Sequence, residues 1–133
     1  MPFDFELAPA TRIVQSRAWG ALSDAELLNH MARVAALFRQ GAVDARWAQI
    51  ADFTGVTDLG GVSSAGVRRM AEDNPWPKDS IRAFIVATDE EFGLVRMYQA
   101  MGDPKTEELC ITRSAADAEA YVARERARLG IVI

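Results

Sequence analysis

The chain has 133 residues, of which half are hydrophobic and about a quarter are charged, and its net charge is −4. These values are typical of one soluble globular domain, and an acidic chain with scattered basic residues lacks the charge pattern of a nucleic-acid-binding protein. A single cysteine allows no intramolecular disulfide. No apolar run approaches the roughly 20 residues that a membrane helix needs, and the start MPFDFELAP lacks a secretion signal. We therefore expect a cytoplasmic protein without membrane insertion.

The first third of the chain predicts a β-hairpin followed by a helix. Phe3–Ala8 alternates apolar and polar residues, as a half-buried strand does, and Ile13–Trp19 is the second arm after a turn. Ser23 and Glu26 have the spacing of a capping box, which opens a helix with one apolar stripe. Gly41 ends this helix.

The middle of the chain predicts two further strands, separated by a loop and a short helix. Arg46–Phe53 is the third strand, and a glycine-rich loop follows it. The helix Ala65–Asp73 comes next and is stopped by Pro75 and Pro77, which cannot continue it. Ile81–Ala87 is almost entirely apolar, as in a central parallel strand that is covered on both faces.

The last third predicts a helix, a strand and a final helix. Thr88 and Glu91 form a second capping box, and Glu107–Thr112 is the fifth strand. Ser114 caps the last helix, which runs to about Leu129. The predicted order is therefore β-β-α-β-α-β-α-β-α. Strands that alternate with helices are joined by right-handed crossovers, so we expect one α/β domain with a five-stranded mixed sheet, mostly parallel, and an antiparallel edge hairpin.

Residues that carry enzyme chemistry are scarce. The only histidine, His30, lies at the edge of the apolar stripe of the first helix and is interpreted as a packing residue. Cys110 falls in a predicted buried strand, where a thiol is inert. One histidine and one cysteine do not make a zinc site, and the dipole at a helix start explains the acidic run Asp89–Glu91. The glycines match no nucleotide-binding motif. We therefore predict a non-enzymatic protein without a metal or cofactor.

The stretch ADFTGVTDLGGVSSAGVRRM, residues 51–70, is the strongest candidate for a site. It leaves the carboxyl end of a predicted parallel strand and enters a helix, where open α/β sheets place their functional crevice. One hypothesis is a phosphorylation switch or a partner-binding loop, in which a phosphoserine gains from the helix dipole, pairs with Arg68 and repels Asp58. The alternative is structural: Ser63 or Ser64 caps the helix, the glycines provide positive φ in a turn, and Asp52 solvates the strand end. The candidate residues are Asp52, Thr54, Thr57, Asp58, Ser63, Ser64 and Arg68.

The helix FGLVRMYQAM carries more apolar side chains than one face needs. Packing into the core is one interpretation, and a homodimer interface or the wall of a pocket for a small, lipid-like ligand are the others. Such a pocket would lie between the sheet and the helices at Leu28–Phe38 and Phe92–Met101. The apolar end GIVI suits either self-association or folding back onto the domain. The residues predicted to share one face are Phe92, Val95, Tyr98 and Met101.

The segments DFTGVTDLGGVSSAGV, FGLVRMYQAM and RSAADAEAYV resemble a SpoIIAA-like family of small stand-alone bacterial proteins of the STAS/SEC14 type. The resemblance covers Phe3 to about Val122 and implies the fold of the anti-sigma-factor antagonists, which carry a phosphorylated serine at the corresponding helix start. In this chain Val62, and not an aspartate, precedes Ser63. The resemblance implies a fold and no particular activity. We predict a non-enzymatic binding or regulatory module that acts through residues 54–66 on a protein partner or on a second copy, with a carrier or sensor of a small apolar ligand as the alternative.

Overall fold

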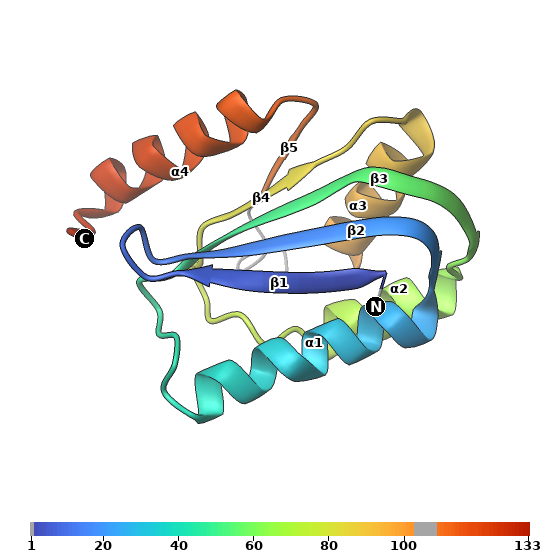
Figure 1. Ribbon diagram of the computed structural model, residues 1–133, viewed down its shortest axis with the longest axis horizontal. Helices are drawn as coiled ribbons and strands as arrows, with labels where there is room; N and C mark the ends of the chain where they lie inside the picture. The colour runs from blue at the N-terminus through green and yellow to red at the C-terminus, as the bar shows by residue number, and fades with distance from the viewer. Residues whose placement is uncertain (1, 103–108) are drawn as a thin grey trace.

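The computed structural model describes residues 2–102 and 109–133, which Figure 1 shows as a ribbon. Within these ranges the element order is β-β-α-β-α-β-α-β-α, as predicted. The first two residues of the predicted strand Glu107–Thr112 lie outside the described ranges. The strands are β1 Phe3–Ala8, β2 Ile13–Ser23, β3 Ala48–Gly61, β4 Arg82–Ile85 and β5 Cys110–Thr112, and the helices are α1 Asp24–Arg39, α2 Ser64–Glu72, α3 Asp89–Met101 and α4 Ala115–Leu129.

The five strands form one mixed sheet in the order β1-β2-β3-β4-β5. β1 pairs with β2 in the antiparallel sense, and the other neighbouring pairs are parallel. This arrangement confirms the predicted single α/β domain with an antiparallel edge. Helices α1 and α2 lie on one face of the sheet and α4 lies on the other (Figure 1). Each face has its own core, one under α1–α3 and one under α4.

Alternation along β4 decides which side chains enter which core. Ala83 and Ile85 pack under α4 together with Ala118, whereas Phe84 points to the other face and packs with Val95 of α3. Because successive side chains of a strand point to opposite faces, a strand covered on both sides must be apolar on both. All four residues of β4 are buried, which confirms the prediction of a strand covered on both faces.

Each helix begins at a side-chain cap that the sequence predicts. The caps, each of which accepts a hydrogen bond from the backbone N–H three residues later, are Ser23, Ser63, Thr88 and Ser114. The oxygen–nitrogen distances run from 3.0 to 3.4 Å. A cap of this kind contributes about 1 kcal/mol. Ser63 is therefore the cap of α2, and Ser64 is its first helical residue.

The predicted glycine-rich loop after Phe53 is wrong, because β3 continues as a strand to Gly61. β2 likewise runs to Ser23 instead of ending at Trp19, and the two strands stay paired through three register shifts. We call the paired segments 19–23 and 55–61 the β2–β3 arm. The arm curves away from the sheet toward the starts of α1 and α2 (Figure 1). A strand ends where its partner ends, and the length of the partner is not visible in the local sequence.

The glycines of β3 permit close approach between backbones. The predicted positive φ is wrong for the glycines between 55 and 66, none of which has it. A Cβ at Gly55 would lie 3.1 Å from the carbonyl oxygen of Ala18, and one at Gly61 would lie 2.9 Å from that of Leu22. Both contacts are with the backbone of β2, so a side chain at Gly61 would require the strands to shift, and one at Gly55 would be tightly packed.

Replacing Gly61 with alanine is expected to lower the free energy of unfolding by about 1–3 kcal/mol, because the new methyl group overlaps the β2 backbone and splays the arm. Gly93→Ala is the matched control. A Cβ at this position of α3 meets nothing within 4 Å, so the same substitution should stabilise the helix by about 0.5–1 kcal/mol. Urea unfolding of both variants measures the two effects. Equal effects of the two substitutions would contradict the close packing of the arm.

Candidate functional site

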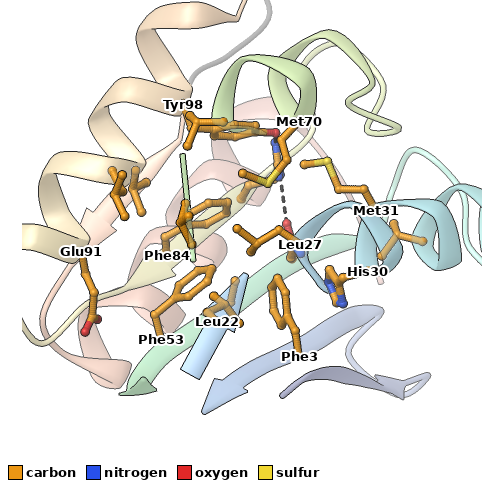
Figure 2. Close-up of a pocket in the computed structure, with 18 of the residues that line it drawn as sticks. Phe3, Leu22, Leu27, His30, Met31, Phe53, Met70, Phe84, Glu91 and Tyr98 are labelled. Carbon is orange, nitrogen blue, oxygen red and sulfur yellow. Dashed lines mark hydrogen bonds between the residues drawn. The ribbon is translucent and has the colours of Figure 1, made fainter. Parts of the chain in front are cut away.

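A cavity of about 80 Å³ lies between the sheet and helices α1, α2 and α3 (Figure 2). Its wall is almost entirely apolar. A water molecule needs roughly 10–15 Å³ of such space, so the cavity has room for a small molecule. The strands β1 to β4, the three helices and the segments beside α2 all contribute to it. The lining residues are Phe3, Leu22, Leu27, His30, Met31, Val34, Gln49, Ala51, Phe53, Leu59, Val62, Val67, Met70, Pro75, Trp76, Arg82, Phe84, Glu91, Leu94, Val95 and Tyr98.

Helical periodicity brings the apolar side chains of α1 to this cavity. Leu27, Met31 and Val34 follow one another at spacings of four and three, which places them on one stripe of the helix. The β2–β3 arm adds Leu22 from β2 and Leu59 from β3. The arm is therefore part of the wall of the cavity, and its position affects the cavity's size.

Four aromatic rings follow one another along the cavity. The ring centroids are 5.3 Å apart between Phe3 and Phe53, 5.8 Å between Phe53 and Phe84, and 6.1 Å between Phe84 and Tyr98. The rings come from β1, β3, β4 and α3, and Figure 2 shows them as a continuous row. We call these four side chains the ring row. All three distances lie in the range where aromatic pairs attract each other.

A chain of hydrogen bonds joins four buried polar residues on the same face of the sheet. Arg82 Nε donates to Gln49 Oε1 at 3.0 Å, and Gln49 Nε2 donates to Ser16 Oγ at 3.2 Å. Ser16 Oγ lies 3.2 Å from His30 Nε2. A guanidinium group only donates, so the carbonyl of Gln49 must face Arg82 and its NH₂ must face Ser16. The direction of the hydrogen bond between Ser16 Oγ and His30 Nε2 depends on the tautomer of the histidine, and His30 Nδ1 is buried without a hydrogen-bond partner among the described residues. We call these residues the polar chain.

His30 lies deeper than the edge position predicted from the sequence, since only 2% of it is exposed. Its ring stacks on Phe3 with centroids 3.7 Å apart and meets the edge of Phe5 at 5.7 Å. Burial lowers the pKa of His30 to about 4, and the positive charge of Arg33 acts in the same direction. The imidazole is therefore neutral at neutral pH.

Arg82 brings a charge into the apolar interior, where only 4% of the residue is exposed. Its guanidinium carbon lies 5.7, 5.2 and 5.4 Å from the ring centroids of Trp76, Phe84 and Tyr98. Nη1 also donates to the Tyr98 hydroxyl at 2.9 Å. Buried charge is costly without such partners, and aromatic faces with charge-assisted hydrogen bonds offset the cost.

The sequence does not predict the polar chain apart from His30. A signal is nevertheless present, because Gln49 and Arg82 are polar residues in two otherwise apolar strand segments, WAQIA and IRAFIVA. A polar residue at a fully buried strand position requires a partner. The identity of that partner depends on how the strands pair, which the sequence does not state.

The candidate residues in β3 form local pairs. Asp52 Oδ1 accepts hydrogen bonds from the backbone N–H and the hydroxyl of Thr54, at 2.8 and 2.6 Å. Asp58 Oδ1 accepts from the backbone N–H of Gly60 at 2.7 Å, and Thr57 is exposed on the arm. These contacts satisfy neighbouring donors along one strand, as short polar side chains commonly do at irregular positions.

Ser63 has a partner that the sequence analysis missed. Its backbone N–H and its hydroxyl donate to the two carboxylate oxygens of Asp24, at 2.9 and 2.5 Å. This contact ties the start of α2 to the start of α1. A Cβ at Gly66 would collide with the Asp24 carboxylate, which accounts for glycine there. Ser64 and Arg68 are exposed on α2, so the structure joins Ser63 to Asp24, a residue 39 positions earlier.

The apolar residues of α3 do not all share one face. Val95 and Tyr98 are buried and line the cavity, and Met101 is half-buried against the same core. Phe92 is 37% exposed and lies outside the lining. A helix turns by about 100° per residue, so each step of three falls 60° short of a full circle. Four residues spaced by three therefore spread around half of the helix, and the predicted common face is wrong for Phe92.

The apolar segment GIVI at the end of the chain is partly buried and partly exposed. Ile131 packs back against the core under α4, whereas 81% of Val132 is exposed. The two hypotheses for the segment GIVI therefore each describe part of it, and whether Val132 and Ile133 mediate self-association stays a prediction.

Nucleophiles and metal ligands are sparse in the part of the chain that the structure describes. Cys110 is half-buried at the start of β5, and burial raises the pKa of its thiol, so the reactive thiolate is disfavoured. Across residues 2–102 and 109–133, histidine, cysteine and acidic side chains form no group of three that could hold a metal ion.

The chain matches no protein-family model and no curated protein. None of the helices among the described residues is long and apolar enough to span a membrane. The cavity, the ring row and the polar chain are therefore the features from which a function can be argued.

Proposed function

We propose that this protein is a non-enzymatic binding module and that its cavity holds a small, largely apolar ligand, so that it acts as a carrier or sensor. The cavity itself carries the proposal. Protein interiors are packed as densely as organic crystals, so about 80 Å³ of apolar space leaves its lining side chains without contacts that a bound apolar ligand would supply.

The fold is compatible with a SpoIIAA-like, STAS-type domain of a cytoplasmic bacterial protein. The mixed five-stranded sheet with its antiparallel β1–β2 pair is the architecture that the resemblance of the sequence implies. The architecture by itself specifies no activity, because function depends on the site. The proposal therefore rests on the cavity, and the resemblance to this family adds support from the fold only.

The direct test is the intact mass of the protein purified from its own host, measured under native and under denaturing conditions. A mass increment that is present natively and lost on denaturation supports a bound ligand, which extraction then identifies. A bare native mass, together with no ligand in the extract, counts against the carrier proposal.

Filling the cavity is expected to abolish ligand binding without unfolding the protein. Ala51 lines the cavity, and Ala51→Val adds two carbon atoms to space that is already there, so stability should change by less than about 1 kcal/mol. Ala83→Val is the matched control, since Ala83 is completely buried in the core under α4. It should lose about 1–3 kcal/mol and keep its ligand. Thermal unfolding and native mass distinguish the two variants.

A second candidate function is contact with a protein partner through the β2–β3 arm and the start of α2. The supporting observation is the exposed hydrogen-bonded pair of Ser63 and Asp24, which joins two helix starts at one place on the surface. Phosphorylation of Ser63 would set a second negative charge against the Asp24 carboxylate and would break this contact. A phosphate on Ser64 would keep the pair and lie near Arg68. The intact mass of the host protein, with the site mapped, tests for either modification.

The two serines are expected to differ in their effect on stability. Ser63→Ala removes both the cap of α2 and the hydrogen bond to Asp24, so it should lower the free energy of unfolding by about 1–2 kcal/mol. Ser64→Ala, one residue further along, should change it by less than about 0.5 kcal/mol because Ser64 is exposed in the first turn. Urea unfolding measures both. A larger loss from Ser64→Ala would contradict the assignment of Ser63 as the cap.

A further inference from the structure

We propose that the ligand of the cavity is an uncharged compound with a single aromatic ring. This inference rests on the proposed function and names the chemical class that the cavity selects. Three features carry it: the size of the cavity, the ring row along its wall, and the way in which the nearby charged groups are already bonded.

The size of the cavity favours a compact molecule over a long chain. An apolar cavity of about 150 Å³ binds one benzene molecule in another protein, and this cavity has about 80 Å³. The cavity would therefore have to widen around a single ring, and Met31 and Met70 are the lining side chains best able to move, since unbranched methionine side chains adapt to their neighbours. A fatty acyl chain would require a far larger displacement of the surrounding helices.

The ring row favours an aromatic ligand over an aliphatic one. Phe53 lies between Phe3 and Phe84, with ring centroids 5.3 and 5.8 Å away, and its ring is tilted relative to both. A ligand ring that joins such a row gains about two- to tenfold in affinity beyond the area it buries. The sulfur atoms of Met31 and Met70 line the same space and also interact well with ring edges.

The bonding of the polar residues favours an uncharged ligand. Arg82 donates to Gln49 and to Tyr98, and Glu91 Oε1 accepts from the backbone N–H of Ala87 at 3.1 Å. His30 is neutral, and its Nδ1 is buried without a hydrogen-bond partner among the described residues, so it offers a hydrogen bond but no charge. The exposed atoms of the cavity wall are almost entirely apolar. A ligand carboxylate would therefore lose its water without gaining equivalent hydrogen bonds in the cavity.

Four probes of similar size separate these features. We would titrate the full chain with toluene, methylcyclohexane, benzoate and 1-octanol, and would follow the methyl resonances of cavity residues by NMR. Toluene should bind, and benzoate should bind at least tenfold more weakly. Each affinity is then corrected for partition between water and hydrocarbon. The corrected affinity for toluene should exceed that for methylcyclohexane about two- to tenfold, and that for 1-octanol by a larger factor.

One pair of variants tests the role of the rings. Phe53→Leu keeps an apolar side chain but interrupts the ring row, so it should remove the preference for toluene over methylcyclohexane. Phe92→Leu, outside the cavity, should leave the preference unchanged.

The outcomes distinguish the inference from the proposed function. Tighter binding of benzoate or 1-octanol than of toluene would overturn the aromatic, uncharged class and would leave the cavity as a binding site. Binding of none of the four probes, together with an Ala51→Val variant that retains any host-derived ligand, would overturn both.

Discussion

Acidification from pH 7 to pH 4 is expected to lower the free energy of unfolding by about 3 kcal/mol. The cause is His30, whose imidazole binds a proton in the unfolded chain but stays neutral in the folded chain over most of this range. The pKa of His30 is about 4 in the folded chain, against 6.5 for an exposed histidine. Each unit of difference corresponds to about 1.4 kcal/mol. Burial is the main cause, and the positive charge of Arg33 adds to it.

The pH range of this loss follows from the two pKa values. Above pH 6.5 the imidazole is neutral in both the folded and the unfolded chain, so its contribution is constant. Between 6.5 and about 4 the unfolded chain binds a proton that the folded chain does not, and unfolding becomes easier as the pH falls. Below about 4 both forms are charged. The pKa values of Asp4, Asp44 and Glu125 are lowered by hydrogen bonds, so their stabilising effects are lost mainly below this range.

Urea unfolding at several values between pH 7 and pH 4 measures the effect. His30 is the only histidine, so His30→Phe should flatten the dependence over this range, whatever its stability at pH 7. The phenylalanine keeps the stack on Phe3, and the lost contact between Ser16 Oγ and the imidazole lowers stability equally at each pH. An unchanged slope in the variant would show that the dependence arises from other groups.

The local features of this fold could be predicted from the sequence because their causes are local. A cap needs only one side chain and the amide three residues later, and all four helices begin where such residues occur. The apolar segment around Phe84 could be identified as a central strand for the same reason. Its neighbours in the sequence show that both faces are covered.

The extent of β3 and the partners of the polar residues could not be predicted because their causes are distant in the sequence. The strand continues through its glycines only because β2 is present to pair with it. Arg82 finds Gln49 33 residues away, and Ser63 finds Asp24 39 residues away. Glycine is required both where two backbones approach closely and where φ is positive, and the sequence does not distinguish these causes. The glycines around Gly61 therefore predict a turn, although the structure has paired strands there.

The candidate site shows the same division. Val95 and Tyr98 could be recognised as members of an apolar helix face, but the cavity beside them is the space that remains after three helices and four strands have packed. The size and shape of this cavity depend on side chains that are far apart in the sequence. The ring row likewise assembles Phe3, Phe53 and Phe84 from three different strands.

Replacing Arg82 with leucine is expected to lower the free energy of unfolding by about 2–4 kcal/mol, the cost of an unpaired buried carbonyl together with a lost hydrogen bond. The substitution leaves Gln49 Oε1 without this donor and removes the hydrogen bond to the Tyr98 hydroxyl. It also removes the cation that packs among the rings of Trp76, Phe84 and Tyr98. The removed cost of burying a charge offsets part of this loss.

Two further variants identify the cause of the Arg82 effect. Arg69→Leu is the control, because 69% of that side chain is exposed and its ion pair with Asp73 lies on the surface, so the change should be under about 0.5 kcal/mol. Gln49→Leu combined with Arg82→Leu replaces both partners by apolar groups. The double variant should be more stable than the sum of the two single losses predicts by at least about 1 kcal/mol, because no unpaired carbonyl then remains between them. Strict additivity, or an Arg82→Leu variant as stable as Arg69→Leu, would mean that the polar chain does not hold this face of the sheet together.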